Sequence, residues 1–190
     1  PFSRACIHPI VFDSGGNRIH GVFLHTNTTL SAGDTLVVFF PGTSGNIDYK
    51  WCRTRLIFAA GYPVFTIDYR GYGMSTGTPT EEGIYEDGRR ALSVVRDKLG
   101  NPRVVIYGQS LGSTVAVEMV SSAVSPAIRR LILESPVGSM NTIVGDAAYL
   151  NIPGTFAASY TVNNIEKMKR VTVPFCWMPV SYTHLTLPTI

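Results

Sequence analysis

The sequence predicts an α/β protein in which a mainly parallel, doubly wound sheet follows an N-terminal antiparallel hairpin. Three observations predict this fold class. Runs that are apolar at every position occur at residues 36–40, 64–67, 104–107 and 131–133, and such runs suit parallel strands covered on both faces. The segments between the later runs have helical periodicity, and strands alternating with helices form βαβ units. Turn residues also close an opening pair of strands.

The opening segment predicts the hairpin. Residues 7–12 and 19–24 are largely apolar, and the run Asp-Ser-Gly-Gly-Asn at 13–17 separates them. Gly and Asn tolerate the positive φ angles that tight hairpin turns need. We therefore expect two antiparallel strands before the first parallel one.

Two helices are predicted between the later strands. Thr80 is a suitable N-cap for the first, and Gly100 with the following Asn-Pro ends it. Residues 111–123 form the second, which is rich in Ala, Val and Met and is expected to be well buried. The apolar positions that share a face of the first helix are Ile84, Ala91, Val95 and Leu99.

Composition indicates one domain with a sizeable core. The 190 residues are 45% hydrophobic and 15% charged, with a formal net charge of +3, which suits a compact fold. Lys167, Lys169 and Arg170 are the nearest approach to a basic cluster, and such a run is typical of a solvated helix face. We expect no nucleic-acid partner, and no cofactor or metal.

The cysteines Cys6, Cys52 and Cys176 are odd in number and have no CxxC spacing. Neither a disulfide framework nor a zinc site is expected, and a reducing compartment such as the cytoplasm fits better than secretion. No apolar run is long enough to cross a bilayer. The chain starts at Pro1, so a lost upstream signal or anchor stays open, and membrane association is expected only through such a segment.

A candidate nucleophile lies where the apolar run 104–107 meets the second helix. Residues 108–112 read Gly-Gln-Ser-Leu-Gly. A sharp strand-to-helix turn holds a serine hydroxyl in the open near a base, and its crowded backbone needs small residues two positions to either side. Ser110 is therefore the predicted nucleophile, with Gly108 and Gly112 as its turn glycines. The alternative is a Gly-Ser turn that opens an ordinary buried helix.

Acyl transfer also needs backbone N–H donors for the negative charge that develops on the carbonyl oxygen. The amide of Leu111, directly after Ser110 and at a helix N-terminus, is one predicted donor. The second is predicted in the loop Pro-Gly-Thr-Ser-Gly-Asn at 41–46, where the N–H of Thr43 is the candidate. A plain connector is the alternative interpretation of this loop.

Taken together, these segments resemble the α/β-hydrolase superfamily, in its branch of small esterases, acyl-thioesterases and serine-peptidase-like proteins. The resemblance rests on residues 41–46, 68–75, 108–112 and 134–136, and it extends over about residues 7–178. It implies a small-molecule or lipid-like acyl substrate (ester, thioester or amide) and an acyl-enzyme on Ser110.

Two residues matter for this resemblance. Pro41 stands where many relatives have histidine, which should perturb the loop without removing the Thr43 amide. Asp68 could be proposed as the acid of a catalytic triad, but the resemblance implies that this position shapes the loop after it.

The acid and the histidine that would complete a catalytic triad with Ser110 are expected to be missing. In this fold the order is Ser, then Asp or Glu, then His, and the resemblance places the acid after a strand at 173–178. No Asp or Glu follows Glu166. Residues 179–189 match one translated frame of a transposase sequencing adapter. We therefore expect 1–178 to be a C-terminally truncated hydrolase domain and 179–190 a non-native tail.

The histidines do not supply a base. His184 falls in the tail, and His8, His20 and His25 lie in the opening hairpin region, where we expect strand or surface residues. Asp146 and Glu118 do not follow a strand end in the required order. The chain is therefore expected to be inactive, and its intact parent to hydrolyse acyl substrates.

Residues 137–169 lie where relatives insert a cap over the site. Apolar residues of this segment either line an acyl pocket or simply pack: Ile143, Tyr149, Ile152, Phe156 and Tyr160. A function of another class also stays open, namely a non-catalytic domain that keeps the fold as a binding or scaffold module.

Overall fold

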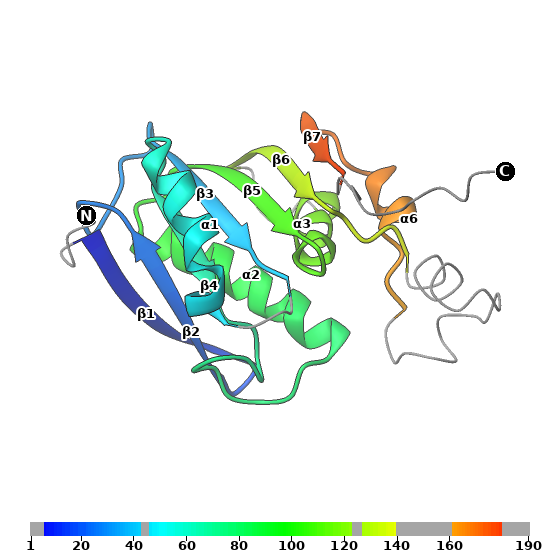
Figure 1. Cartoon of the computed structure of the whole chain (residues 1–190), viewed down its shortest axis with the longest axis horizontal. Coiled ribbons are helices and arrows are strands. Elements are labelled where there is room, and N and C mark those ends of the chain that lie inside the picture. Colours follow the sequence, from blue (N-terminus) through cyan, green and yellow to red (C-terminus); the bar gives the residue numbers. More distant parts are fainter. Residues whose placement is uncertain (1–5, 43–45, 123–126, 140–160, 180–190) are drawn as a thin grey trace, which may run out of the picture.

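The structure, a computed structural model, describes residues 6–42, 46–122, 127–139 and 161–179. These residues form a seven-stranded sheet with helices on both faces (Figure 1). In chain order the elements are β1 (Ile7–Ser14), β2 (Asn17–Leu24), β3 (Thr35–Phe40), α1 (Ile47–Ala59), β4 (Val64–Ile67), α2 (Glu81–Lys98), β5 (Arg103–Gln109), α3 (Gly112–Ser121), β6 (Ile128–Glu134), α6 (Asn164–Met168) and β7 (Phe175–Met178).

The strands of this sheet lie in the order β1-β2-β4-β3-β5-β6-β7. β2 pairs antiparallel with both β1 and β4, whereas every pairing from β4 to β7 is parallel. The predicted fold class is confirmed: a mainly parallel sheet, covered on both faces, follows an antiparallel hairpin.

The hairpin turn is tighter than the sequence suggested. Ser14 pairs with Asn17, so both strands extend into the segment that we expected to be a loop. Gly15 and Gly16 alone make the turn, with φ angles of 57° and 78°. Two successive positive φ angles match the twist of the flanking strands, and glycine adopts them without a steric penalty.

The central strands are apolar throughout because each face of the sheet has its own core. In β3, Val37 and Phe39 belong to the cluster that packs against α1. The alternate residues Leu36, Val38 and Phe40 belong to the larger cluster with α2 and α3. Successive side chains of a strand point to opposite faces, so a strand between two helical layers needs apolar residues at every position.

The structure has helices at the segments where the sequence shows a strong apolar periodicity. The Thr80 hydroxyl oxygen accepts from Gly83 N–H at 3.1 Å and caps α2, and α3 begins one residue later than predicted. Helix α1 was not predicted. Two of its thirteen residues are buried, Ile47 and Thr54, so it shows little of the apolar repeat by which helices are recognised.

A buried ion pair fixes the loop between β4 and α2. The Arg70 guanidinium lies 2.8 Å from the fully buried Asp87 carboxylate, which also accepts from the Arg70 backbone N–H at 2.9 Å. Arg70 further donates to the Ser14 hydroxyl at 3.2 Å. The hydrogen bond to Asp87 raises the pKa of Arg70. One arginine therefore joins the hairpin, the loop and helix α2.

Helix α6 is bound to α3 through an ion pair between Lys167 and Glu118, at 2.8 Å. Both side chains are less than one-fifth exposed, so Lys167 is not the solvated residue that its neighbourhood suggested. Burial raises the pKa of the Glu118 carboxyl, but hydrogen bonds from Lys167 and Ser122 outweigh burial and hold the pKa below its usual 4.5.

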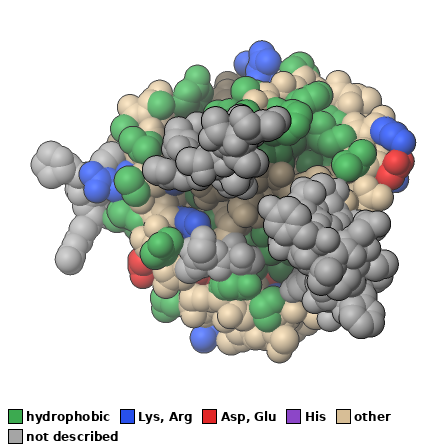
Figure 2. Space-filling view, turned by 45° about the vertical axis from the view of Figure 1, so that its right-hand side comes forward, with side chains coloured by type: hydrophobic (Ala, Val, Ile, Leu, Met, Phe, Trp, Pro, Cys, Tyr) green, Lys and Arg blue, Asp and Glu red, His purple; other side chains and the backbone are tan. Residues whose placement is uncertain are grey.

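Figure 2 shows the molecule after the β7 side has been turned forward. Among the described residues in that view, Lys and Arg side chains are few and scattered between hydrophobic ones. Phe175 and Trp177 on β7 are more than half exposed. Within the part of the chain that the structure describes, no helix combines the length and the apolar character needed to cross a bilayer.

Candidate active site

Ser110 lies in the tight turn between β5 and α3, at the end of the sheet where the parallel strands finish. Its φ angle is 51°, in the left-handed region that non-glycine residues rarely occupy and that is often found at functional sites. The residue is exposed rather than sunk in the core. The backbone of the turn therefore presents the hydroxyl to solvent.

The two glycines that flank this turn are required by close backbone packing. A Cβ atom at Gly112 would lie 2.0 Å from the Phe40 carbonyl oxygen. At Gly108 it would lie 2.6 Å from the Ala116 Cβ and 2.7 Å from the Gly112 carbonyl oxygen. Neither position has room for a side chain, which agrees with the sequence argument for small residues.

The start of the 41–46 loop packs against the candidate nucleophile. A Cβ atom at Gly42 would lie 3.0 Å from the Ser110 Cβ and 3.5 Å from its Oγ. Thr43, the predicted oxyanion donor of this loop, lies outside the described residues. Leu111, the other predicted donor, is half-buried and directly precedes α3, where the unpaired N–H groups and the helix dipole favour negative charge.

Glu134, at the end of β6, anchors the turn from the side. Its carbonyl oxygen accepts from the Ser110 N–H at 3.0 Å, and its carboxylate accepts from Gln109 at 3.2 Å. The same carboxylate binds Tyr107 and Arg53. Burial, together with the hydrogen bond to Glu134, raises the pKa of Tyr107. In the sequence, Glu134 stands out only as part of the family resemblance, and no local pattern indicates this role.

The histidines of the hairpin lie away from the candidate nucleophile. His20 is on β2, and β4 and β3 separate β2 from β5. Three steps of about 4.8 Å between neighbouring strands amount to about 14 Å, which is beyond hydrogen-bond reach. His8 is on the edge strand β1, and His25 directly follows β2. His184 and Asp146 lie outside the described residues.

Asp68 ties the N-terminus of α1 to the loop after β4. One carboxylate oxygen accepts from the Ile47 N–H at 2.8 Å, and the other from the Met74 N–H at 3.4 Å. Burial raises the pKa of this carboxyl above 3.8, although both hydrogen bonds and the nearby His20 act in the opposite direction. These contacts agree with the loop-shaping role expected for Asp68.

The expected cap segment leaves and rejoins the fold at one place. Ser139 and Asn163 form an isolated antiparallel bridge, and the Asn164 side chain donates to the Val137 carbonyl oxygen at 2.6 Å. The residues that we expected to line a pocket or to pack lie outside the described part of the chain: Ile143, Tyr149, Ile152, Phe156 and Tyr160.

Comparison with known proteins is consistent with this geometry. Residues 35–161 match the family described as the alpha/beta hydrolase fold, which is more than half of the chain. The chain belongs to that family.

Several curated proteins are similar to this chain. The uncharacterized protein YfhR of Escherichia coli (strain K12) is 32% identical over 143 residues, which are 74% of this chain and 49% of YfhR. The lysophosphatidylserine lipase ABHD12 of Bos taurus is 33% identical over 111 residues, or 56% of this chain and 28% of that protein. The chain thus spans about half the length of YfhR, and less of ABHD12.

Solved structures share the fold at low sequence identity. An alpha-beta hydrolase from Vibrio vulnificus superposes with a TM-score of 0.73 at 20% identity, covering 92% of this chain and 64% of that one. Acetyl xylan esterase 1 from Thermoanaerobacterium sp. gives 0.67 at 18% identity, covering 93% and 69%. At these identities the likeness concerns the fold alone.

Proposed function

We propose that this chain is the nucleophile-bearing part of a serine hydrolase that acts on acyl substrates. The observation that carries the proposal is the conformation of Ser110, a strained and exposed serine between a strand and a helix, with Gly42 packed against it. Membership of the alpha/beta hydrolase family supports the same reaction class. A relative named a lysophosphatidylserine lipase supports lipid-like esters as substrates, with thioesters and amides as the other acyl candidates.

In the proposed reaction the Ser110 oxygen attacks the acyl carbonyl carbon, and its proton passes to an imidazole base. The amides of Thr43 and Leu111 stabilise the negative charge on the carbonyl oxygen. The leaving group departs with a proton from the imidazolium, and water then releases the acid from the acyl-enzyme. The hairpin histidines are too distant to serve as that base, so we propose that further sequence supplies the acid and the histidine.

It follows that the 190-residue chain is inactive by itself. Loss of the base leaves the serine hydroxyl protonated, and removal of one member of a triad can lower turnover about a million-fold. We expect a fluorophosphonate probe to leave this chain unlabelled. Labelling of the chain as it stands would contradict its inactivity.

The decisive experiment uses the gene recovered past codon 178 from its source DNA. A fluorophosphonate probe should label the longer protein, Ser110→Ala should abolish the labelling, and Ser31→Ala, at an exposed serine outside the turn, should leave it unchanged. A longer protein that is not labelled, or that is labelled equally in Ser110→Ala, would overturn the proposal. A folded but unlabelled longer protein would favour the binding or scaffold module.

A further inference from the structure

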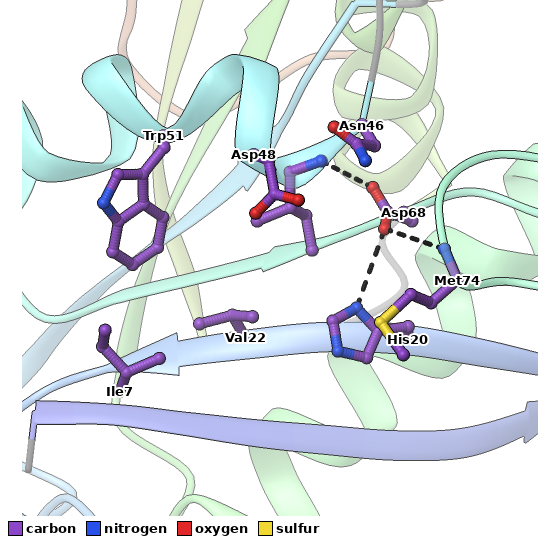
Figure 3. A pocket seen from close by; sticks show the side chains of 9 residues that line it. Ile7, His20, Val22, Asn46, Asp48, Trp51, Asp68 and Met74 are labelled. Carbon is purple, nitrogen blue, oxygen red and sulfur yellow. Dashed lines mark hydrogen bonds and ion pairs between the residues drawn. The ribbon is translucent and has the colours of Figure 1, made fainter. Parts of the chain in front are cut away.

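A cavity lies on the α1 face of the sheet, beside the hairpin. Its volume is about 460 Å³, within the range of about 300–1,000 Å³ typical of small-molecule sites. Ser110 is not among the described residues that line it, although Asn46, at the end of the 41–46 loop, is. Its lining residues are Ile7, His20, Val22, Asn46, Ile47, Asp48, Trp51, Asp68 and Met74 (Figure 3).

One side of this cavity is lined mainly by apolar side chains, which the periodicity of the strands and of helix α1 places on the same side. On β2, His20 and Val22 are two residues apart and therefore share a face of the sheet. Ile7 comes from the adjacent strand β1. On α1, Ile47 and Trp51 are four residues apart, so they lie on one side of the helix. Figure 3 shows the Trp51 ring facing Ile7 and Val22 across the open space.

The other end of the cavity is polar and carries negative charge. Asp48 is exposed, whereas Asp68 is almost completely buried. Among the described residues that line the cavity there is no Lys or Arg. His20 Nδ1 lies 3.7 Å from an Asp68 carboxylate oxygen, and this buried nitrogen has no hydrogen-bond partner. Within the described part of the cavity wall, the two carboxylates therefore lie beside an imidazole and beside no lysine or arginine.

These features favour a ligand that carries positive charge. A buried carboxylate is stabilised by a nearby cation, and Asp68 receives neutral backbone N–H groups from Ile47 and Met74. A cation close to an indole ring gains further attraction from the ring face. An anionic ligand would be repelled by the two carboxylates, and a neutral one would gain no ionic attraction from them.

We propose that this cavity binds an amphipathic organic ammonium ion, with its apolar body along Ile7, Val22 and Trp51 and its charged end toward Asp48 and Asp68. The site does not depend on the reaction proposed for Ser110. It is available for testing in the chain as it stands.

The fluorescence of Trp51 provides the test. The chain has two tryptophans, and Trp177 is 64% exposed, so Trp177→Phe should fold normally and leave Trp51 as the single reporter. This variant is titrated with hexylammonium, 1-hexanol and hexanoate, which match in length and differ in charge. We expect a saturable change with hexylammonium at a Kd at least about fivefold lower than for 1-hexanol, which corresponds to one modest ion pair. Hexanoate should not bind.

Charge variants in the Trp177→Phe background distinguish an ion pair within the cavity from a general electrostatic attraction between the ligand and the protein. Asp48→Asn should raise the Kd for hexylammonium about two- to fivefold. Asp97→Asn, at an exposed aspartate on α2, should leave it unchanged because α2 covers the opposite face of the sheet. The proposal is overturned if hexylammonium does not saturate, if 1-hexanol or hexanoate binds as tightly, or if the two aspartate variants behave alike.

Discussion

The backbone N–H of Ser110 donates to the carbonyl oxygen of Glu134 across 3.0 Å, which joins the turn after β5 to the end of β6. The Glu134 carboxylate accepts at the same time from the side chains of Gln109, Tyr107 and Arg53. A single residue on the neighbouring strand therefore holds the turn through its main chain and through its side chain.

Glu134→Ala should lower the free energy of unfolding by about 2–3 kcal/mol, because the buried Tyr107 and the partly buried Gln109 and Arg53 lose their acceptor. Glu134→Gln retains one acceptor oxygen and should cost less. Urea unfolding gives the free energies, and hydrogen exchange should show faster opening at the Ser110 amide. Glu82→Ala, at a side chain that is 87% exposed, should change stability by less than about 0.5 kcal/mol. Equal losses in the two alanine variants would contradict the anchoring role.

Gly112→Ala should destabilise the fold by about 3 kcal/mol or prevent a cooperative transition. The new Cβ would lie 2.0 Å from a backbone oxygen of Phe40, and the clash cannot be relieved by a rotamer change. Gly33→Ala is the matched control, since a Cβ at Gly33 meets nothing within 4 Å. Thermal and urea unfolding measure both variants. A Gly112→Ala protein as stable as Gly33→Ala would show that the turn packs more loosely than described.

Asp87→Ala should lower the free energy of unfolding by about 3 kcal/mol, because it leaves the largely buried Arg70 guanidinium with only the partly exposed Glu86, at 2.8 Å, as an ion-pair partner among the described residues. Adding Arg70→Met should restore part of the loss, since the incompletely paired charge is then removed as well. Asp97→Ala, at an exposed aspartate paired with Arg96, serves as the control. Urea unfolding of the parent chain, of Asp87→Ala, of Arg70→Met and of the double variant completes the cycle. Loss of less than about 1 kcal/mol in Asp87→Ala would count against a structural role for the pair.

Stability at acid pH should depend on Glu118. Its pKa is lower in the folded protein than its usual 4.5, so the folded state binds the proton less readily than the unfolded chain does. The stabilisation is therefore complete above pH 4.5 and is lost as the pH falls through the lowered pKa. Glu118→Gln should cost about 1 kcal/mol at pH 7 and should flatten the acid dependence of urea unfolding.

Glu166→Gln is the control for this pH dependence, because Glu166 makes a solvent-exposed pair with Lys169. Such pairs contribute little to stability. If Glu118→Gln retained the acid dependence of the parent chain, the Lys167–Glu118 pair would not be its source.

The fold was predictable where one sequence pattern permits one structure. The apolar run 36–40 and the cap at Thr80 are both found where local chemistry placed them. Helix α1 was missed because most of its side chains are not buried, so its sequence carries no strong apolar repeat. The strand order was also beyond prediction, since nothing in β2 itself specifies β4 as its second partner.

The candidate site also has a part that the sequence predicts and a part that it does not. Ser110 and its glycines lie within five consecutive residues, and backbone sterics alone connect them to a turn. The contacts of Glu134 join residues 81, 27 and 25 positions apart, and the cavity beside Trp51 brings together two strands, a helix and the loop after β4. Such groups of residues come together only after the sheet has formed, so no local sequence pattern predicts them.

The bridge between Ser139 and Asn163 has a consequence for evolution. The two ends of the intervening stretch are held side by side. The length of this stretch can therefore change without altering the register of β6 or the position of α6. Each doubling of such a stretch adds only about 0.6 kcal/mol of closure entropy. A related protein with a longer or shorter stretch between these two residues would therefore need no change in the supporting framework.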